Sequence, residues 1–236
     1  YLNEPSNPNI ALPARLFGDR INSHGYDLTD PLALNKLMKK RDAWKTHRWT
    51  AKPAVAANLP ESTSRSQINP TDPEDVVGSV SDMSISDVAT VLEAARAWPA
   101  SQPERAKILR RAADLYEQNA YEFMAILARE AGKTLLDCEG EIREAVDFLR
   151  YYSDQSEQHA SRQPCGIFGC ISPWNFPLAI FTGQIAAALA TGNGVVAKPA
   201  EQTPLIAYRA IELLHEAGVP SDCLQLAIGP GAEIGA

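Results

Sequence analysis

The sequence predicts an α/β fold in which a helical layer precedes the βαβαβ half of a Rossmann-like parallel sheet. Residues 163–197 contain no Asp, Glu, Lys or Arg, as expected for strands and helices of a sheet that is covered on both faces. Short apolar runs then alternate with helical patterns, which indicates parallel strands joined by right-handed crossovers. Prolines, glycines and asparagines interrupt the uncharged segment, so it predicts a buried core rather than a membrane span.

The composition excludes several classes of protein. Of the 236 residues, 45% are hydrophobic and 22% are charged, which excludes a disordered or collagen-like chain. The net charge is −7 and no dense basic stretch is present, so we expect no nucleic-acid binding. Four cysteines form no CxxC pair and four histidines lack metal-ligand spacing, which favours a reducing cytoplasm and no metal site. The chain starts with Tyr1 and no leader follows, which indicates processing or excision from a longer protein.

Residues 1–66 are interpreted as a connecting arm. Prolines recur throughout this stretch, and residues 61–67 are polar and rich in serine. Only residues 31–46 have apolar side chains at helical spacing. The segment is therefore more typical of a connection than of a compact domain.

Residues 67–163 are predicted to be mostly helical. Val76 and Val77 indicate one short strand before Gly78. Helices are then expected over residues 86–98, 101–119, 121–131 and 136–158. The second of these opens with a capping box at residues 101–104, and the third ends at Gly132.

Residues 164–236 alternate between strand and helix patterns. Strands are expected at 166–171, 195–197 and 224–228, and helices at 178–190 and 204–218. A further helical signal begins at Ala232. Because a dinucleotide-binding sheet has more than three strands, we expect the chain to stop inside this domain.

Three loops follow the carboxyl ends of these strands, where ligands bind in such sheets. Asn175 in the first loop can stabilise a developing oxyanion through its amide, or merely close a turn through its own backbone; local composition favours the turn. Lys198 and Glu201 in the second can bind a ribose diol, or form an exposed ion pair, which local composition favours. Gly229 and Gly231 in the third allow close approach of a ligand.

Other polar residues are assigned structural roles from the pattern alone. Cys165 and Cys170 fall in or beside a strand, where buried and inert thiols are expected. Four acidic residues crowd the helix at 136–158, and such charges usually form a solvated face: Glu139, Glu141, Glu144 and Asp147.

Two motifs resemble the aldehyde dehydrogenase superfamily. They are ISPWNFP at residues 171–177 and AKPAEQTP at residues 197–204, which begins 20 residues after the first ends. The resemblance extends through 130–133 and 215–220 and so covers residues 66–236. Within it, residues 144–152 resemble the L-glutamate γ-semialdehyde (1-pyrroline-5-carboxylate) dehydrogenases. Residues 181–185 and 4–10 resemble the proline utilization A family, in which a flavin-dependent proline dehydrogenase precedes this module.

The resemblance implies a role for each loop. Asn175 would be the oxyanion donor, and Lys198 and Glu201 would bind the adenosine ribose of NAD. Phe176 would pack against the aldehyde chain, and Glu144 would face the substrate, contrary to the solvated-face interpretation. Other residues would line the cofactor cleft or pass beneath the adenine: Ile171, Ser172, Pro173, Trp174, Pro199, Ala200, Gly229 and Gly231.

The resemblance also implies what the chain lacks. The family's cysteine nucleophile, its glutamate base and its pyrophosphate-binding turn all lie downstream of Ala236, so we expect the isolated chain to be inactive. FAD would belong only to the upstream domain, and the partners would be a small aldehyde and the rest of the same polypeptide. A homo-oligomer is possible, although the stretch between Tyr152 and Cys165, where an oligomerisation hairpin often begins, is short. The alternatives are a non-catalytic nucleotide-binding or regulatory chain, or another NAD-dependent aldehyde dehydrogenase.

Overall fold

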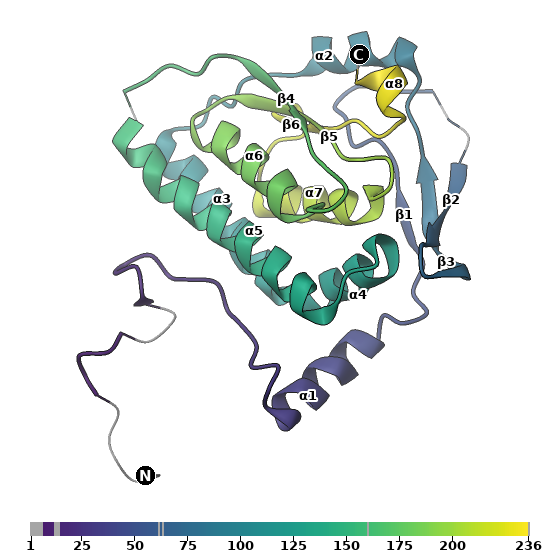
Figure 1. The fold of residues 1–236 in the computed structure, drawn as a ribbon. Helices are drawn as coiled ribbons and strands as arrows, with labels where there is room; N and C mark the ends of the chain where they lie inside the picture. The colour runs from purple at the N-terminus through teal and green to yellow at the C-terminus, as the bar shows by residue number, and fades with distance from the viewer. Residues whose placement is uncertain (1–6, 12–14, 61, 63, 160, 236) are drawn as a thin grey trace.

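The computed structural model, which describes residues 7–11, 15–60, 62, 64–159 and 161–235, contains a parallel sheet with helices on both faces (Figure 1). Its strands are β4 (Ile167–Ile171), β5 (Gly194–Lys198) and β6 (Leu224–Leu226), in the order β4-β5-β6. Both pairs are parallel, with Gly169 opposite Val196 and Ile171 opposite Lys198. The predicted βαβαβ half-sheet is therefore confirmed.

The two faces of this sheet are covered by different layers. Helices α6 (Ala179–Ala190) and α7 (Pro204–Ala217) cover one face, and α2 (Ile85–Ala94) and α8 (Gly231–Ile234) lie on the other. A second helical layer packs outside α6 and α7 and consists of α3 (Gln102–Gln118), α4 (Ala120–Ala131) and α5 (Leu135–Gln155). The apolar faces of these helices merge into one core, whose largest fully buried side chains include Tyr116, Phe123 and Phe181.

Most predicted helix ends fall within a few residues of the observed ones. Gly132 adopts the left-handed conformation that ends α4, with φ of 65°. The largest error concerns α2, which begins after Ser84 rather than at Ser86 and ends before the Trp98 that was expected to close it. Asp87 accepts hydrogen bonds from the Ser84 N–H (2.9 Å) and hydroxyl (2.7 Å), and this pairing sets the start of the helix.

A second, mixed sheet was only partly predicted. β1 (Trp49–Ala51), β2 (Ser64–Asn69) and β3 (Asp72–Ser81) form it in the order β1-β3-β2, with β1 parallel to β3 and β2 antiparallel. Only the middle of β3, at Val76 and Val77, is predicted from the sequence. Residue Ala54 also pairs with Leu226 of the parallel sheet, so residues 49–54 connect the two sheets.

The predicted arm is more ordered than its prolines indicate. Its helix, α1 (Pro31–Asp42), is confirmed and is capped by the Asp30 carboxylate, which accepts a hydrogen bond from Leu32 N (2.9 Å). Part of the motif at residues 4–10 lies outside the described residues. The domain boundary at residue 66 stays a prediction, although it falls inside β2.

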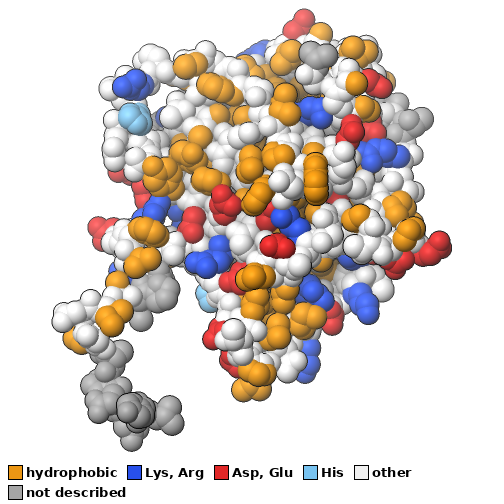
Figure 2. Space-filling view, viewed as in Figure 1, with side chains coloured by type: hydrophobic (Ala, Val, Ile, Leu, Met, Phe, Trp, Pro, Cys, Tyr) orange, Lys and Arg blue, Asp and Glu red, His pale blue; other side chains and the backbone are white. Residues whose placement is uncertain are grey.

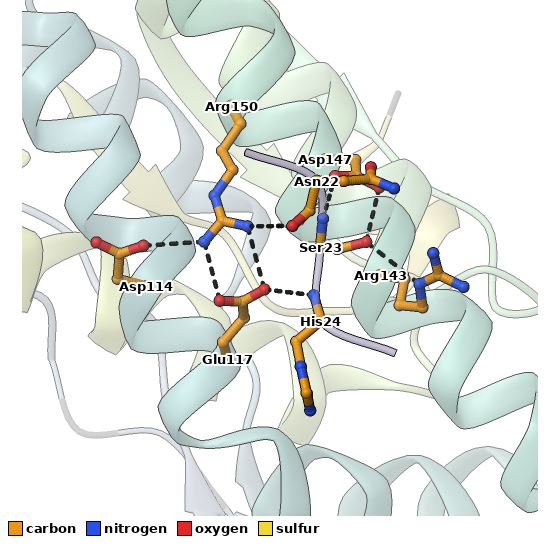
Figure 3. Close-up of polar contacts among 8 residues, drawn as sticks. All are labelled: Asn22, Ser23, His24, Asp114, Glu117, Arg143, Asp147 and Arg150. Atoms are coloured by element: carbon orange, nitrogen blue, oxygen red, sulfur yellow. Dashed lines mark hydrogen bonds and ion pairs between the residues drawn. The ribbon is translucent and has the colours of Figure 1, made fainter. Parts of the chain in front are cut away.

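Residues 22–26 of the arm lie along α3 and α5 (Figure 3). Asp147 accepts hydrogen bonds from Ser23 N (2.8 Å) and Ser23 Oγ (2.7 Å), and Glu117 accepts one from His24 N (2.7 Å). Glu139, which is buried, accepts one from Tyr26 N (2.7 Å). The prediction that the acidic residues of α5 form a solvated face is therefore wrong for Glu139 and Asp147, which hold the arm.

Within the described part of the chain, no helix is both long enough and apolar enough to cross a membrane. Acidic and basic side chains lie next to one another across the middle of the face drawn in Figure 2.

Replacing Gly194 with alanine should destabilise the protein by about 1–3 kcal/mol, the usual cost of forcing atoms into a packed core. A Cβ at this position would overlap the Arg96 carbonyl oxygen and lie 2.7 Å from Ile167 Cδ1. Gly140→Ala is the matched control, because nothing lies within 4 Å of the methyl group that this change adds on the exposed side of α5. Alanine should stabilise that helix by about 0.5–1 kcal/mol. Urea unfolding of both variants measures the difference, and equal effects would contradict the expectation.

Candidate functional site

The loops that follow β4, β5 and β6 meet at the carboxyl edge of the parallel sheet. The Ser172 N–H donates to the Lys198 carbonyl (3.1 Å), and the Ala227 N–H donates to the Ala197 carbonyl (2.8 Å). Two residues after β3 ends, Met83 N donates to the Ile228 carbonyl (2.7 Å). The three loops singled out in the sequence are therefore brought together.

A cavity of about 180 Å³ opens on the face of the sheet that carries α2. Ile171 and Lys198 contribute to it from neighbouring strands, because paired residues of adjacent strands point to the same face. Helix α2 and the chain around α8 supply most of the other walls, and the remaining lining residues are Met83, Val88, Val91, Leu92, Gly169, Val196, Ala227, Ile234 and Gly235. The described residues that line the cavity are mostly apolar, and Lys198 is the one cation among them.

Lys198 and Glu201 do not form the exposed ion pair that local composition favoured, although the structure describes both side chains. Lys198 is buried and its Nζ donates to the Pro199 carbonyl (3.2 Å). Burial lowers the pKa of Lys198, and the nearby carboxylates of Glu201 and Asp82 oppose this shift. Glu201 is exposed and one of its oxygens accepts a hydrogen bond from Gly231 N (3.1 Å). A buried cation and an exposed carboxylate thus lie on one short loop.

The third loop lies against the second. Through its N–H, Gly231 bonds to Glu201, so residues 229–231 and 198–201 are placed together as the sequence predicted. A Cβ on Gly229 would lie 3.0 Å from Ile234 Cδ1 and 3.3 Å from the Met83 carbonyl, so a larger residue there would press on the cavity wall. Within the loop after β5, Pro199 is buried and Ala200 is half-buried.

The loop after β4 presents an amide to solvent. Asn175 is exposed, and within the described residues its side chain makes no hydrogen bond, so the turn-closing role is not observed. Trp174 and Phe176 beside it are also exposed, while Pro173 is half-buried. Ser172 is buried, and its Oγ has no hydrogen-bond partner among the described atoms.

A buried ion pair supports this loop from below. Glu141 accepts hydrogen bonds from Leu178 N (3.2 Å) and Ala179 N (2.7 Å) at the start of α6. Its other oxygen lies 2.9 Å from Lys133 Nζ, which in turn lies 5.0 Å from the centre of the Phe176 ring. The prediction that Glu141 lies on a solvated face is wrong, because its side chain is buried. The missed signal is spacing: position 141 follows Cys138 by three residues and precedes Ala145 by four, and both are buried.

A second buried glutamate supports the loop after β5. Glu130 of α4 accepts hydrogen bonds from Leu205 N (2.7 Å) and Ile206 N (2.9 Å) at the start of α7. Burial raises the pKa of Glu130 to about 8, against the opposing effect of these two donors. Each of the two functional loops therefore ends at a helix whose first N–H groups are bound by a carboxylate of the helical layer.

Glu144 lies apart from the cofactor-side cavity. It is exposed on α5 and lines a separate, open cavity of about 560 Å³, together with Arg143, Phe148 and Tyr151. Partial desolvation of its carboxyl group, reinforced by the charge of Glu141, raises the pKa of Glu144 above its ordinary value. Phe176 does not line that cavity, so the two residues assigned to the substrate are not brought into one pocket.

The cysteines divide into two groups. Burial raises the pKa of Cys138, Cys170 and Cys223 to about 12, 11 and 12, which leaves them as inert thiols. Cys165 is exposed, contrary to the prediction, because it precedes β4 at the amino edge of the sheet. That edge is opposite the one where the loops meet. Among the described residues, no group of three or more His, Cys, Asp or Glu side chains is placed to hold a metal ion.

Comparison with known proteins gives a family model and relatives that agree with one another. The aldehyde dehydrogenase family model matches residues 59–236. The chain is 47% identical over 238 residues to the bifunctional protein PutA of Escherichia coli K12, covering 97% of this chain and 18% of that protein. It is 39% identical over 188 residues to the 1-pyrroline-5-carboxylate dehydrogenase of Geobacillus kaustophilus, covering 71% and 36%. The chain thus spans less than a fifth of the length of the PutA relatives that it matches.

Solved structures agree with these matches. The 1-pyrroline-5-carboxylate dehydrogenase from Thermus with bound NAD superposes with a TM-score of 0.82 at 26% identity, over 91% of this chain and 46% of that one. Proline utilization A from Bradyrhizobium japonicum gives a TM-score of 0.78 at 37% identity, over 97% and 22%. These matches confirm the resemblance that the motifs at 171–177 and 197–204 indicated. The chain belongs to the aldehyde dehydrogenase family.

Proposed function

We propose that the chain forms the N-terminal portion of an NAD-dependent L-glutamate γ-semialdehyde dehydrogenase module within a bifunctional protein of the PutA type. One observation carries this proposal: the Asn175 loop and the Lys198–Glu201 loop converge at the carboxyl edge of the sheet, beside a mostly apolar cavity. In the proposed organisation, residues 1–66 connect to an upstream proline dehydrogenase that holds FAD. Residues 67–163 form the helical layer, and residues 164–236 begin the NAD-binding domain.

The chain's own residues bind and orient in this proposal. Lys198 and Glu201 hold the adenosine ribose. The apolar cavity accepts the rest of the nucleoside, which fits a site whose charged residues lie on one side only. When bound, NAD⁺ supplies the acceptor for the substrate hydride. Asn175 donates its amide N–H to the aldehyde oxygen as negative charge builds there. The thiolate that attacks the aldehyde comes from outside these 236 residues, since no cysteine here lies in the site.

An assay of the full-length protein tests the proposal. We expect NAD⁺-dependent oxidation of L-glutamate γ-semialdehyde with a higher kcat/KM than that for simple aliphatic aldehydes of similar length. A preference for aliphatic aldehydes would favour a different aldehyde dehydrogenase. A full-length protein that binds NAD⁺ but oxidises no aldehyde would favour the regulatory alternative.

Glu201→Gln should lower the preference of the full-length enzyme for NAD⁺ over NADP⁺. A carboxylate accepts a hydrogen bond from the ribose 2′-hydroxyl, whereas it repels the 2′-phosphate of NADP⁺. Glutamine keeps an acceptor and removes the charge, so NAD⁺ binding should weaken modestly and NADP⁺ binding should improve. The ratio of kcat/KM for the two cofactors, in wild type and variant, measures the effect. A ratio that does not move would mean that Glu201 does not face the ribose.

A further inference from the structure

The loop that carries Glu201 is also held from its outer side, by the second sheet. Arg65 and Gln67 are alternate residues of β2 and point to the same side of that strand. Arg65 Nη2 donates to the Glu201 carbonyl (3.1 Å), and Gln67 Nε2 donates to the Gln202 carbonyl (2.5 Å). Two consecutive carbonyls of the cofactor loop therefore accept hydrogen bonds from a strand more than 130 residues away in sequence.

The two donors are themselves fixed. Arg65 Nε donates to Asp82 Oδ2 (2.7 Å), and Arg65 Nη1 donates to Gln67 Oε1 (3.0 Å). Asp82 directly precedes Met83, which lines the cavity and bonds to the Ile228 carbonyl. One guanidinium thus connects the end of β3, the side chain of Gln67 and the cofactor loop. Arginine suits this position because its planar fork serves three acceptors at once.

The Glu201 side chain depends on this support. It is exposed, and its only hydrogen bond among the described residues is the one from Gly231 N, at 3.1 Å. The backbone of the loop therefore sets where the carboxylate lies. Because electrostatic repulsion between two charges falls with their separation, discrimination against a 2′-phosphate requires the carboxylate to be held close to it.

We propose that Arg65 and Gln67 are positioning residues that hold the Glu201 loop in place and so set the preference between NAD⁺ and NADP⁺. The inference rests on the proposed function. Neither side chain needs to touch the dinucleotide, since both act through the main chain of residues 201 and 202.

The direction in which Arg65→Met changes the cofactor preference distinguishes a positioning role from a direct effect of the arginine charge. Arg65→Met removes a positive charge near the ribose, which by itself would weaken NADP⁺ binding and raise the preference for NAD⁺. Loss of positioning does the opposite, because a displaced Glu201 repels the 2′-phosphate less. We expect the ratio of kcat/KM for NAD⁺ to that for NADP⁺ to fall about tenfold, the usual effect of one net hydrogen bond. The KM for the aldehyde and kcat at saturating NAD⁺ should change by less than about twofold.

Further variants of the full-length enzyme complete the experiment. Arg65→Lys keeps the charge without the fork and should lower the ratio as well. Gln67→Leu removes the bond to Gln202 and the acceptor of Arg65 Nη1, but it keeps the bonds of Arg65 to Asp82 and to the Glu201 carbonyl, so it remains informative if Arg65→Met does not fold. The control is Arg110→Met, which breaks the ion pair of Arg110 with Asp154 (2.6 Å) on the outer helical layer. The side chains of this pair are exposed to a similar extent as those of Arg65 and Asp82. It should leave the cofactor ratio unchanged.

A double-mutant cycle tests whether Arg65 changes the cofactor preference through Glu201. If Arg65 acts through Glu201, then Arg65→Met should have little effect on the ratio in a Glu201→Gln background. Equal effects in both backgrounds, or a rise in NAD⁺ preference in Arg65→Met, would overturn the assignment. Wild-type enzyme that binds neither dinucleotide would overturn the proposed function and this inference together. Wild-type enzyme that prefers NAD⁺, with variants that do not change that preference, would overturn this inference alone.

Discussion

Asn175→Ala should lower kcat of the full-length dehydrogenase by about 10²–10³-fold and change the KM for the aldehyde far less. The amide is exposed on the loop after β4 and makes no hydrogen bond to the described residues, so it is available to a substrate oxygen. A preorganised donor acts mainly when charge builds on that oxygen in the transition state, so its loss appears in kcat rather than in ground-state binding. Steady-state kinetics with L-glutamate γ-semialdehyde measures both constants.

Asn193→Ala is the matched control for this variant. Asn193 is buried, and its oxygen accepts hydrogen bonds from Cys165 N (2.7 Å) and Gly166 N (3.1 Å). Its removal should cost about 1–3 kcal/mol of stability, because two backbone N–H groups lose a buried acceptor, without lowering kcat of the folded enzyme. If Asn175→Ala instead lowers stability and leaves kcat unchanged, Asn175 closes a turn and is not the oxyanion donor.

The parallel half-sheet could be predicted because its signals are local. The strands 167–171 and 194–198 are short apolar runs, and the helices between them end at loops that contain glycine or proline. These elements are recognised from the composition of their own residues, although β4 buries only Cys170, so no knowledge of distant partners is needed. The positions of Asn175, Lys198 and Glu201 follow from the same pattern, since loops after parallel strands share one edge.

The mixed sheet could not be predicted because its strands depend on distant partners. β2 has the sequence SRSQIN and only two buried residues, so it lacks the apolar alternation of a strand. β1 has three residues and forms beside Gly78 of β3, 29 positions after Trp49. A Cβ on Gly78 would overlap the Trp49 carbonyl oxygen, which shows how closely the two backbones approach. That approach is a property of the pair and is not visible in either segment alone.

The buried glutamates show a second limit of structure prediction from the sequence. Sequence reasoning placed the acidic residues of α5 on a solvated face because isolated buried carboxylates are costly. Glu141 is nevertheless buried, since Lys133 and the first N–H groups of α6 compensate its charge. All three of these partners lie outside α5, so the compensation is not apparent from the helix itself.

Lys133→Met should therefore destabilise the protein by about 3–5 kcal/mol, the usual cost of leaving one partner of a buried ion pair uncompensated. The side chains of Lys133 and Glu141 are only 14% and 1% exposed, so water cannot replace the lost ammonium. Methionine has a similar length and keeps the contact with the Phe176 ring through its flexible apolar chain. Urea unfolding of the purified variant measures the loss.

Two further variants test whether charge, rather than packing, explains the loss. Glu141→Gln added to Lys133→Met removes the uncompensated charge while keeping an oxygen that can accept from Leu178 N and Ala179 N, so it should restore most of the stability. Arg110→Met breaks a half-buried pair with Asp154, which is far more exposed than Lys133 and Glu141, and should cost only about 0–1 kcal/mol. A double variant no more stable than Lys133→Met would mean that Lys133 contributes through packing alone, and that the donors at the start of α6 suffice to hold Glu141 in the core.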